Sequence, residues 1–170
     1  MRSHRLALLV ALTCAAIPAT AQSLCDLVPA AVVQSTLGIP ATLTAAPNTQ
    51  GGNGCDYKGA STGPITLTAD TIADAGVYKT IFDQRIHSLG PTEQLVSGIG
   101  GAAYYAFKPD QQIPKYHGIN FTQQAIVFRA KGKIVNFILV IPGSGVPKAS
   151  MLALATYTIS KPIDTLKDPT

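Results

Sequence analysis

The sequence predicts an α+β fold in which an antiparallel sheet of about five or six strands is packed by two or three helices. Residues 124–141 carry most of this prediction, because two runs of β-branched and aromatic residues flank a Lys-Gly pair, the pattern of a β-hairpin. Residues 65–70 alternate apolar and polar side chains, as a half-buried strand does. Apolar side chains recur at helical spacing in residues 74–89 and 147–159, which indicates two helices.

Residues 1–21 are predicted to be a signal peptide that is cleaved on export. Two arginines near the start precede an apolar core at residues 6–17, which is too short to cross a bilayer comfortably. Ala19-Thr20-Ala21 then has the form of a cleavage site before Gln22. We interpret residues 22–170 as a single α+β domain without a transmembrane segment. The expected location is therefore periplasmic or secreted.

Cys14 raises the alternative that the chain is a lipoprotein, but Ala11-Leu12-Thr13 lacks the small residue usually found before a lipidated cysteine. Cleavage after Ala21 removes Cys14 and leaves Cys25 and Cys55, an even pair that suits an oxidising compartment. A disulfide between them would close a loop of roughly 30 residues and stabilise the fold by about 3–4 kcal/mol. Two free, buried thiols are the alternative. No Cys-x-x-Cys sequence indicates redox chemistry.

The composition restricts the classes of partner. The chain is 46% hydrophobic and 13% charged, with a formal net charge of +4. Without the two arginines of the signal peptide, eleven basic residues stand against nine acidic ones, a net charge of +2. So small a balance gives no reason to expect binding to nucleic acid or to an anionic membrane surface.

The predicted helices are residues 26–37, 74–89 and 147–159. Asp26 is a plausible cap for the first helix, Pro29 suits its first turn, and Gly38 ends it. The second helix ends at Gly90-Pro91 and has a stripe made by Tyr78, Ile81, Phe82, Arg85 and Leu89. The third helix begins at Pro147 and has a stripe made by Met151, Leu152, Ala155 and Ile159.

The predicted strands are residues 56–58, 64–71, 102–107, 116–121 and the two arms of the hairpin. By composition, residues 45–54 and 108–115 are loops, and residues 161–170 are a polar tail expected to fray. Gly98-Ile99-Gly100-Gly101 precedes a predicted strand rather than a helix. It therefore indicates a tight turn and not a dinucleotide-binding loop.

The hairpin has a register that the sequence predicts. A two-residue turn at Lys131-Gly132 would place Ala130 opposite Lys133 and Ile126 opposite Phe137. One face would then be apolar and enter the core; it carries Ile126, Phe128, Val135 and Phe137. The other face mixes apolar and polar side chains; it carries Val127, Arg129, Ile134, Asn136 and Ile138.

Candidate functional residues are few, and no catalytic, metal or cofactor site is indicated. His87 and His117 are not spaced as metal ligands, and no Gly-x-Ser-x-Gly sequence occurs. The candidates for contact with a partner are Tyr104, Tyr105, Tyr116 and His117. Successive strand residues point to opposite sides, so Tyr104 and Tyr105 cannot both enter the core of a one-sided sheet. One of them is then either exposed or covered by a neighbouring helix or loop.

Several short motifs together resemble one group of proteins. They are Cys25-Asp26-Leu27-Val28-Pro29-Ala30-Ala31-Val32, Leu37-Gly38, Gly54-Cys55-Asp56-Tyr57 and Gly98-Ile99-Gly100-Gly101-Ala102-Ala103-Tyr104. The set is similar to the small exported bacterial two-cysteine domains of unknown function found in actinobacterial lipoproteins, whose related folds serve as sensor domains of receptor kinases. The resemblance implies a two-cysteine α+β sandwich and no catalytic residues. This chain differs from those lipoproteins in lacking a lipidation site of the expected form.

Two classes of function are compatible with these observations. The first is a non-enzymatic domain that binds a protein partner or a small envelope ligand through loops held by a rigid sheet. The alternative is a small periplasmic hydrolase-like enzyme, in which His117, an aspartate and a hydroxyl meet only in the fold. We favour the first class, because no base and nucleophile in the sequence are placed to act together.

Overall fold

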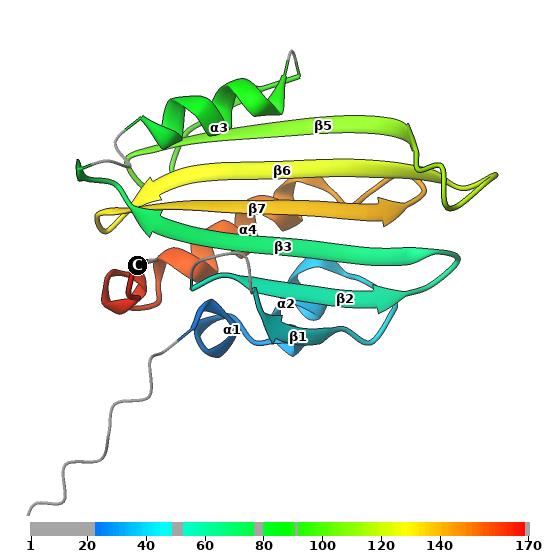
Figure 1. The fold of residues 1–170 in the computed structure, drawn as a ribbon, viewed down its shortest axis with the longest axis horizontal. Coiled ribbons are helices and arrows are strands. Elements are labelled where there is room, and N and C mark those ends of the chain that lie inside the picture. Colours follow the sequence, from blue (N-terminus) through cyan, green and yellow to red (C-terminus); the bar gives the residue numbers. More distant parts are fainter. Residues whose placement is uncertain (1–22, 49–52, 77–79, 91, 169–170) are drawn as a thin grey trace, which may run out of the picture.

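A computed structural model of the chain describes residues 23–48, 53–76, 80–90 and 92–168. Its central feature is an antiparallel sheet with the strand order β1-β2-β3-β7-β6-β5-β4 (Figure 1). The strands are β1 (Thr44–Pro47), β2 (Cys55–Ala60), β3 (Pro64–Ala73), β4 (Gln94–Val96), β5 (Ala102–Gln112), β6 (Asn120–Ala130) and β7 (Lys133–Pro142). The helices are α1 (Leu24–Leu27), α2 (Ala30–Leu37), α3 (Ile81–Leu89) and α4 (Lys148–Ile159), followed by the 3-10 turn η2 (Ile163–Thr165). The predicted α+β class is confirmed.

The sheet has seven strands rather than five or six, because the sequence did not reveal its short edge strands β1 and β4. Residues 45–47 were expected to be loop, yet they pair with β2, from Thr44 opposite Lys58 to Pro47 opposite Cys55. β1 is exposed along its whole length and contains alanine and proline, which are depleted in strands. The extended conformation of β1 is therefore determined by its pairing with β2 and not by its own sequence pattern.

The β6–β7 hairpin has the predicted register. Ala130 lies opposite Lys133 and Ile126 lies opposite Phe137. The turn residues Lys131 and Gly132 both have positive φ, at 50° and 69°, which is the backbone form that matches the twist of a tight hairpin.

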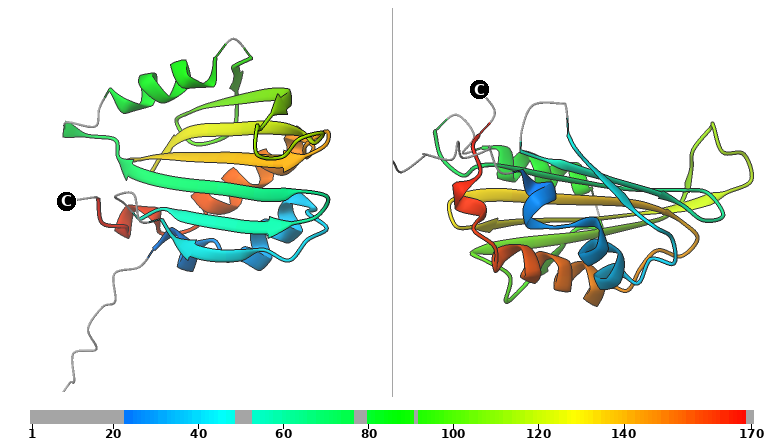
Figure 2. Two further views of the ribbon diagram at one scale, coloured as in Figure 1. Left: turned by 45° about the vertical axis from the view of Figure 1, so that its right-hand side comes forward. Right: turned by 90° about the horizontal axis from the view of Figure 1, so that it is seen from below.

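Helices cover both faces of the sheet (Figure 2). α1, α2 and α4 pack on the face that carries Ile126, Phe128, Val135 and Phe137, and these side chains lie in the main core as predicted. α3 packs on the opposite face, where Val127 and Ile134 are also buried. The mixed face of the hairpin is thus a second, smaller core rather than a surface, and this explains why β6 and β7 are apolar on both sides.

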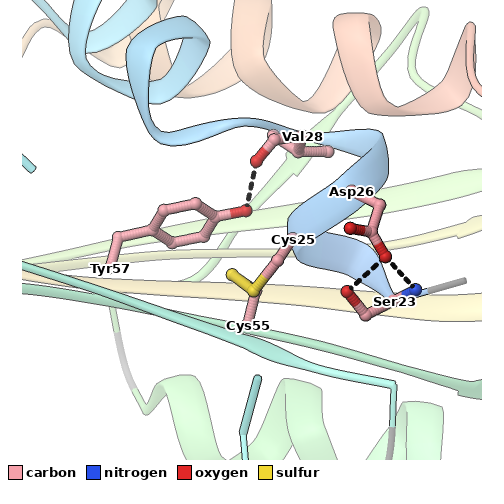
Figure 3. Close-up of a disulfide and its surroundings, with 6 residues drawn as sticks. All are labelled: Ser23, Cys25, Asp26, Val28, Cys55 and Tyr57. Carbon is pink, nitrogen blue, oxygen red and sulfur yellow. Dashed lines mark hydrogen bonds between the residues drawn. A yellow bond between two sulfur atoms is a disulfide. The ribbon is translucent and has the colours of Figure 1, made fainter. Parts of the chain in front are cut away.

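The N-terminal segment forms two helices where one, 26–37, was predicted. Val28 and Pro29 are non-helical, because the proline ring disfavours a helical conformation at the residue before it. Asp26 lies inside α1 instead of capping it, and its Oδ2 accepts hydrogen bonds from the backbone N–H and the hydroxyl of Ser23, at 2.7 and 2.8 Å (Figure 3). These bonds, the backbone one first, lower the pKa of the Asp26 carboxyl. The end of α2 at Gly38, with φ of 65°, is as predicted.

α3 is shorter than the helix predicted for residues 74–89. β3 continues through Ala73, and the Asp74 N–H donates to the Gly132 carbonyl at 2.8 Å, which extends the strand pairing. Of the predicted stripe, Phe82 and Leu89 are buried, whereas Tyr78 lies outside the described residues.

The strand β5 extends further than predicted. Lys108 to Gln112 was assigned to a loop, but these residues continue β5, with an irregular register between Lys108 and Gln111. Lys108 is still in regular pairing and lies opposite Gln123 of β6. The strand pairing thereby places the Lys108 side chain on the sheet rather than in a loop.

The C-terminal segment is held against the sheet and does not form a frayed tail in its described part. Ile163 and Leu166 are buried in the main core. The Lys133 ammonium, itself almost fully buried, donates to the Leu166 carbonyl at 2.7 Å and pairs with Asp168 at 2.8 Å. In α4, Met151 and Ala155 are buried as predicted; the other fully buried positions are Leu154 and Thr158 rather than Leu152 and Ile159.

The predicted disulfide joins Cys25 of α1 to Cys55 of β2, with a Cα–Cα distance of 5.1 Å (Figure 3). Beside it, the hydroxyl of Tyr57 donates to the Val28 carbonyl at 2.6 Å. Tyr57 is fully buried, and burial raises the pKa of its hydroxyl. One covalent bond and one buried hydrogen bond therefore fix the α1–α2 segment on the edge of the sheet.

Reduction of the Cys25–Cys55 disulfide is expected to lower the free energy of unfolding by about 3–4 kcal/mol, because the open chain regains the entropy of the loop. Urea unfolding with and without reductant, followed by circular dichroism, measures this difference. The double variant Cys25→Ala/Cys55→Ala is the control. Its free energy of unfolding should equal that of the reduced protein and should not change when reductant is added. An unchanged unfolding midpoint in the wild-type protein would contradict the prediction.

Replacing Tyr57 by Phe is expected to lower the free energy of unfolding by about 1–3 kcal/mol, because the buried Val28 carbonyl loses its partner. Tyr157→Phe is the matched control, since the Tyr157 hydroxyl makes no hydrogen bond to any described residue. The comparison is made by urea unfolding at neutral pH, and equal effects of the two substitutions would refute the role of the Tyr57 hydroxyl.

The difference in the free energy of unfolding between the wild type and Tyr57→Phe should depend on pH. The folded-state pKa of Tyr57 is raised above the unfolded value of about 10. The wild-type advantage over Tyr57→Phe is therefore complete below pH 10 and shrinks as the pH rises above it, because the unfolded state releases the proton first.

Candidate functional site

α3 covers only part of its face of the sheet (Figure 1). The helix has nine residues and spans roughly 14 Å, whereas the eleven residues of β6 extend over roughly 36 Å. A hollow lies on the sheet where α3 ends, and we call it the α3 hollow. It encloses about 30 Å³, or about 310 Å³ when the space open to solvent is counted. The enclosed part has room for a water molecule or for one small chemical group.

The lining of the α3 hollow is half apolar and half polar. The apolar residues are Leu89, Ala106, Ala125 and Ile138. The polar residues are Ser88, Lys108, Gln123 and Asn136. A small apolar surface with a few convergent polar groups is the usual composition of a ligand site.

Asn136 is the unusual residue of this lining. It is only 5% exposed, and its side-chain amide makes no hydrogen bond to any residue that the structure describes. An amide offers two donors and an acceptor oxygen. The Asn136 amide nitrogen and oxygen are not fully buried, so this end of the side chain reaches the open part of the α3 hollow. The amide of Asn136 is therefore a set of unused hydrogen-bonding groups inside the α3 hollow.

Gln124, on the neighbouring strand but the other face, shows how this fold treats a buried amide that supports the structure. Its Nε2 donates to the Tyr105 hydroxyl and to the Val146 carbonyl, both at 2.8 Å. Its Oε1 accepts from the Val146 N–H at 2.7 Å. The contrast separates a structural amide, which is satisfied within the chain, from the unpartnered amide of Asn136.

Lys108 provides the net charge of the α3 hollow. Its ammonium makes one long hydrogen bond, 3.5 Å, to the Ser88 carbonyl at the end of α3, and forms no ion pair with the described residues. Asp70, which lies opposite Asn136 in the sheet, is paired with Arg85 at 2.9 Å. Among the described residues that line the hollow, Lys108 is therefore the one that carries a charge, and that charge is positive.

The structure places Tyr104 and Tyr105 on opposite faces of the sheet. The Tyr104 ring is half-buried under α3 and packs edge-on against Phe82, with ring centroids 6.1 Å apart. Tyr105 is 3% exposed, accepts the hydrogen bond from Gln124, and has a raised pKa because of its burial. Both rings are thus engaged in packing within the domain.

Tyr116 and His117 lie in the connection between β5 and β6, which rises from the sheet on the same side as α3 (Figure 2). The half-buried Tyr116 ring packs against Phe121, with centroids 5.8 Å apart. Phe121 and Gln123 share a face because they are two residues apart in β6, so this connection bounds the sheet face beyond the α3 hollow. His117 is exposed, and its imidazole has no carboxylate or hydroxyl partner among the described residues.

Sequence reasoning did not identify Lys108 or Asn136 as site residues. The sequence predicts a loop at Lys108 and a strand face of mixed polarity that includes Asn136. The one signal for Asn136 was its isolated polar side chain within the apolar run IVNFILVI. The sequence does not show that the Asn136 amide lacks a hydrogen-bond partner, because its neighbours in space are known only from the fold.

Within the described ranges, no three His, Cys, Asp or Glu side chains are grouped so that they could hold a metal ion. None of the helices there combines the length and the hydrophobicity needed to cross a bilayer. No family model matches the sequence, and no characterised protein or solved structure matches it either. The function must therefore be argued from the α3 hollow and its residues.

Replacing Asn136 by Leu is expected to raise the free energy of unfolding by up to about 1 kcal/mol, because an amide that makes no hydrogen bond to a described residue is replaced by an apolar group of similar size. Gln124→Leu is the matched control and should lower it, because the Tyr105 and Val146 groups would lose their partner. Urea unfolding of the two variants measures both changes in the free energy of unfolding, which should have opposite signs. Destabilisation by both would show that the Asn136 amide is structural.

Proposed function

We propose that this protein is an exported, non-enzymatic domain that binds a small ligand of the cell envelope in the α3 hollow. The observation that carries the proposal is the unpartnered amide of Asn136, which lines the hollow and is 5% exposed. Binding sites commonly retain polar groups that reduce stability, because a ligand satisfies them only on binding. The signal-peptide features of residues 1–21 and the Cys25–Cys55 disulfide support export to the periplasm or the medium.

A small ligand accounts for the site better than a large protein partner does. Tyr104 and Tyr105, two of the four residues that the sequence suggests for partner contact, pack inside the domain. Tyr116 and His117 lie in the β5–β6 connection at the border of the same sheet face, so we keep them as candidates for contact with a ligand that extends beyond the hollow. The hydrolase alternative has no comparable support, because the exposed His117 has no carboxylate or hydroxyl partner among the described residues.

Four probes that share one alkyl chain and differ in the polar group test this function: butyrate, butanol, butylammonium and butyramide. Each is titrated at constant ionic strength into the purified, ¹⁵N-labelled protein. At least one probe should cause saturable chemical-shift changes confined to the residues of the α3 hollow, including the side-chain NH₂ of Asn136. If none of the four does so, the proposed function is wrong.

Ala106→Leu is a variant in which the α3 hollow should be filled, so that it serves as the negative control for this titration. Its larger side chain would fill the hollow, so the saturable changes should disappear. Ala60→Leu, at an exposed position of β2 outside the lining, is the matched control and should bind as the wild type does. The amide spectrum of each variant shows whether it is folded, and Ala125→Leu replaces Ala106→Leu if the latter is not.

A further inference from the structure

The charge of the α3 hollow limits the class of ligand, provided that the proposed function holds. The described residues that line the hollow include no carboxylate, and Asp70, which lies opposite Asn136, is neutralised by Arg85. Of these lining residues Lys108 carries a charge, and it forms no ion pair with the described residues. A cationic ligand would lie beside this ammonium without a counter-charge, whereas an anionic ligand would supply one.

The hydrogen-bonding groups favour the same class. Lys108 uses one of its three N–H donors for the long bond to Ser88, which leaves two for a ligand. The Asn136 amide adds two further donors within the hollow, and Gln123, opposite Lys108 in the sheet, adds the donors of its half-buried amide. Charge-assisted bonds from an ammonium to an anionic oxygen are stronger than neutral ones, so an anionic oxygen is the best match for this set.

The size of the enclosed space and the dipole of α3 both favour a ligand with a single negative charge. The enclosed space of about 30 Å³ holds one small group. The end of α3, whose Ser88 carbonyl contacts Lys108, carries the partial negative charge of a helix C-terminus. A dianion such as a phosphate monoester would exceed the single positive charge of Lys108 and be repelled by this helix end, whereas a carboxylate would be neutralised.

The remaining surface of the hollow is apolar and is formed by Ala106, Ala125, Ile138 and Leu89. We propose that the ligand is a small organic monocarboxylate, whose carboxylate binds Lys108 and Asn136 and whose short alkyl part lies on this apolar surface. Binding would supply the partners that Asn136 lacks and the counter-charge that Lys108 lacks.

The four-probe titration described above is repeated with Lys108→Gln. In the wild type, butyrate should bind about tenfold more tightly than butanol or butylammonium, because it alone brings a negative charge to the Lys108 ammonium. Lys108→Gln should weaken butyrate binding by about tenfold and leave butanol binding unchanged. Lys115→Gln, which removes an exposed lysine outside the lining, is the matched control and should change neither affinity.

The outcomes separate this inference from the proposed function. If butanol, butyramide or butylammonium binds in the hollow as tightly as butyrate, or if Lys108→Gln leaves butyrate binding unchanged, the carboxylate class is wrong while the ligand site stands. If no probe binds there, both proposals fail. Shifts that appear with butyrate but also spread evenly over exposed lysines such as Lys115 would indicate non-specific ion binding and would overturn the carboxylate assignment.

Discussion

The pairing of β6 with β7 is the interaction on which the rest of the structure depends. These adjacent central strands are apolar on both faces, so the sheet needs cover on both sides to exclude water from them. α1, α2 and α4 provide extensive cover on one face. Of the helices among the described residues, only α3 packs on the other face, and its short length leaves the α3 hollow on a surface that is otherwise core. The candidate site is therefore a direct consequence of incomplete cover over a two-sided sheet.

The features that the sequence predicted correctly are those determined by near neighbours in the chain. The hairpin register follows from the turn at Lys131-Gly132 and from alternation along two adjacent strands. The Cys25–Cys55 disulfide, which joins residues 30 apart in the chain, is the exception: it follows from the count of cysteines left once residues 1–21 are taken as a signal peptide. The edge strand β1 did not follow, because its pairing with β2 and not its composition makes it a strand.

The candidate site could not be predicted from the sequence, because it too depends on contacts between residues that are far apart in the chain. Gln124 and Asn136 are both amides in the central hairpin, and nothing local distinguishes a satisfied amide from an unpartnered one. Gln124 is satisfied by Tyr105 and Val146, which lie 19 and 22 residues away in the chain. Asn136 faces the side of the sheet where α3 ends. Only the placement of distant elements turns one amide into a structural support and the other into a group available to a ligand.

The position of Lys108 shows how a small change of secondary structure determines the chemistry of this surface. Lys108 pairs with Gln123 in the last regular part of β5, just before the register becomes irregular. Strand alternation therefore turns its side chain to the same face as Ala106 and the α3 hollow. Had β5 ended at Phe107, as the sequence indicated, no backbone pairing would fix the ammonium there. The extension of one strand thus places a positive charge beside the Asn136 amide at the edge of the apolar part of the hollow, and the proposed ligand class rests on that charge.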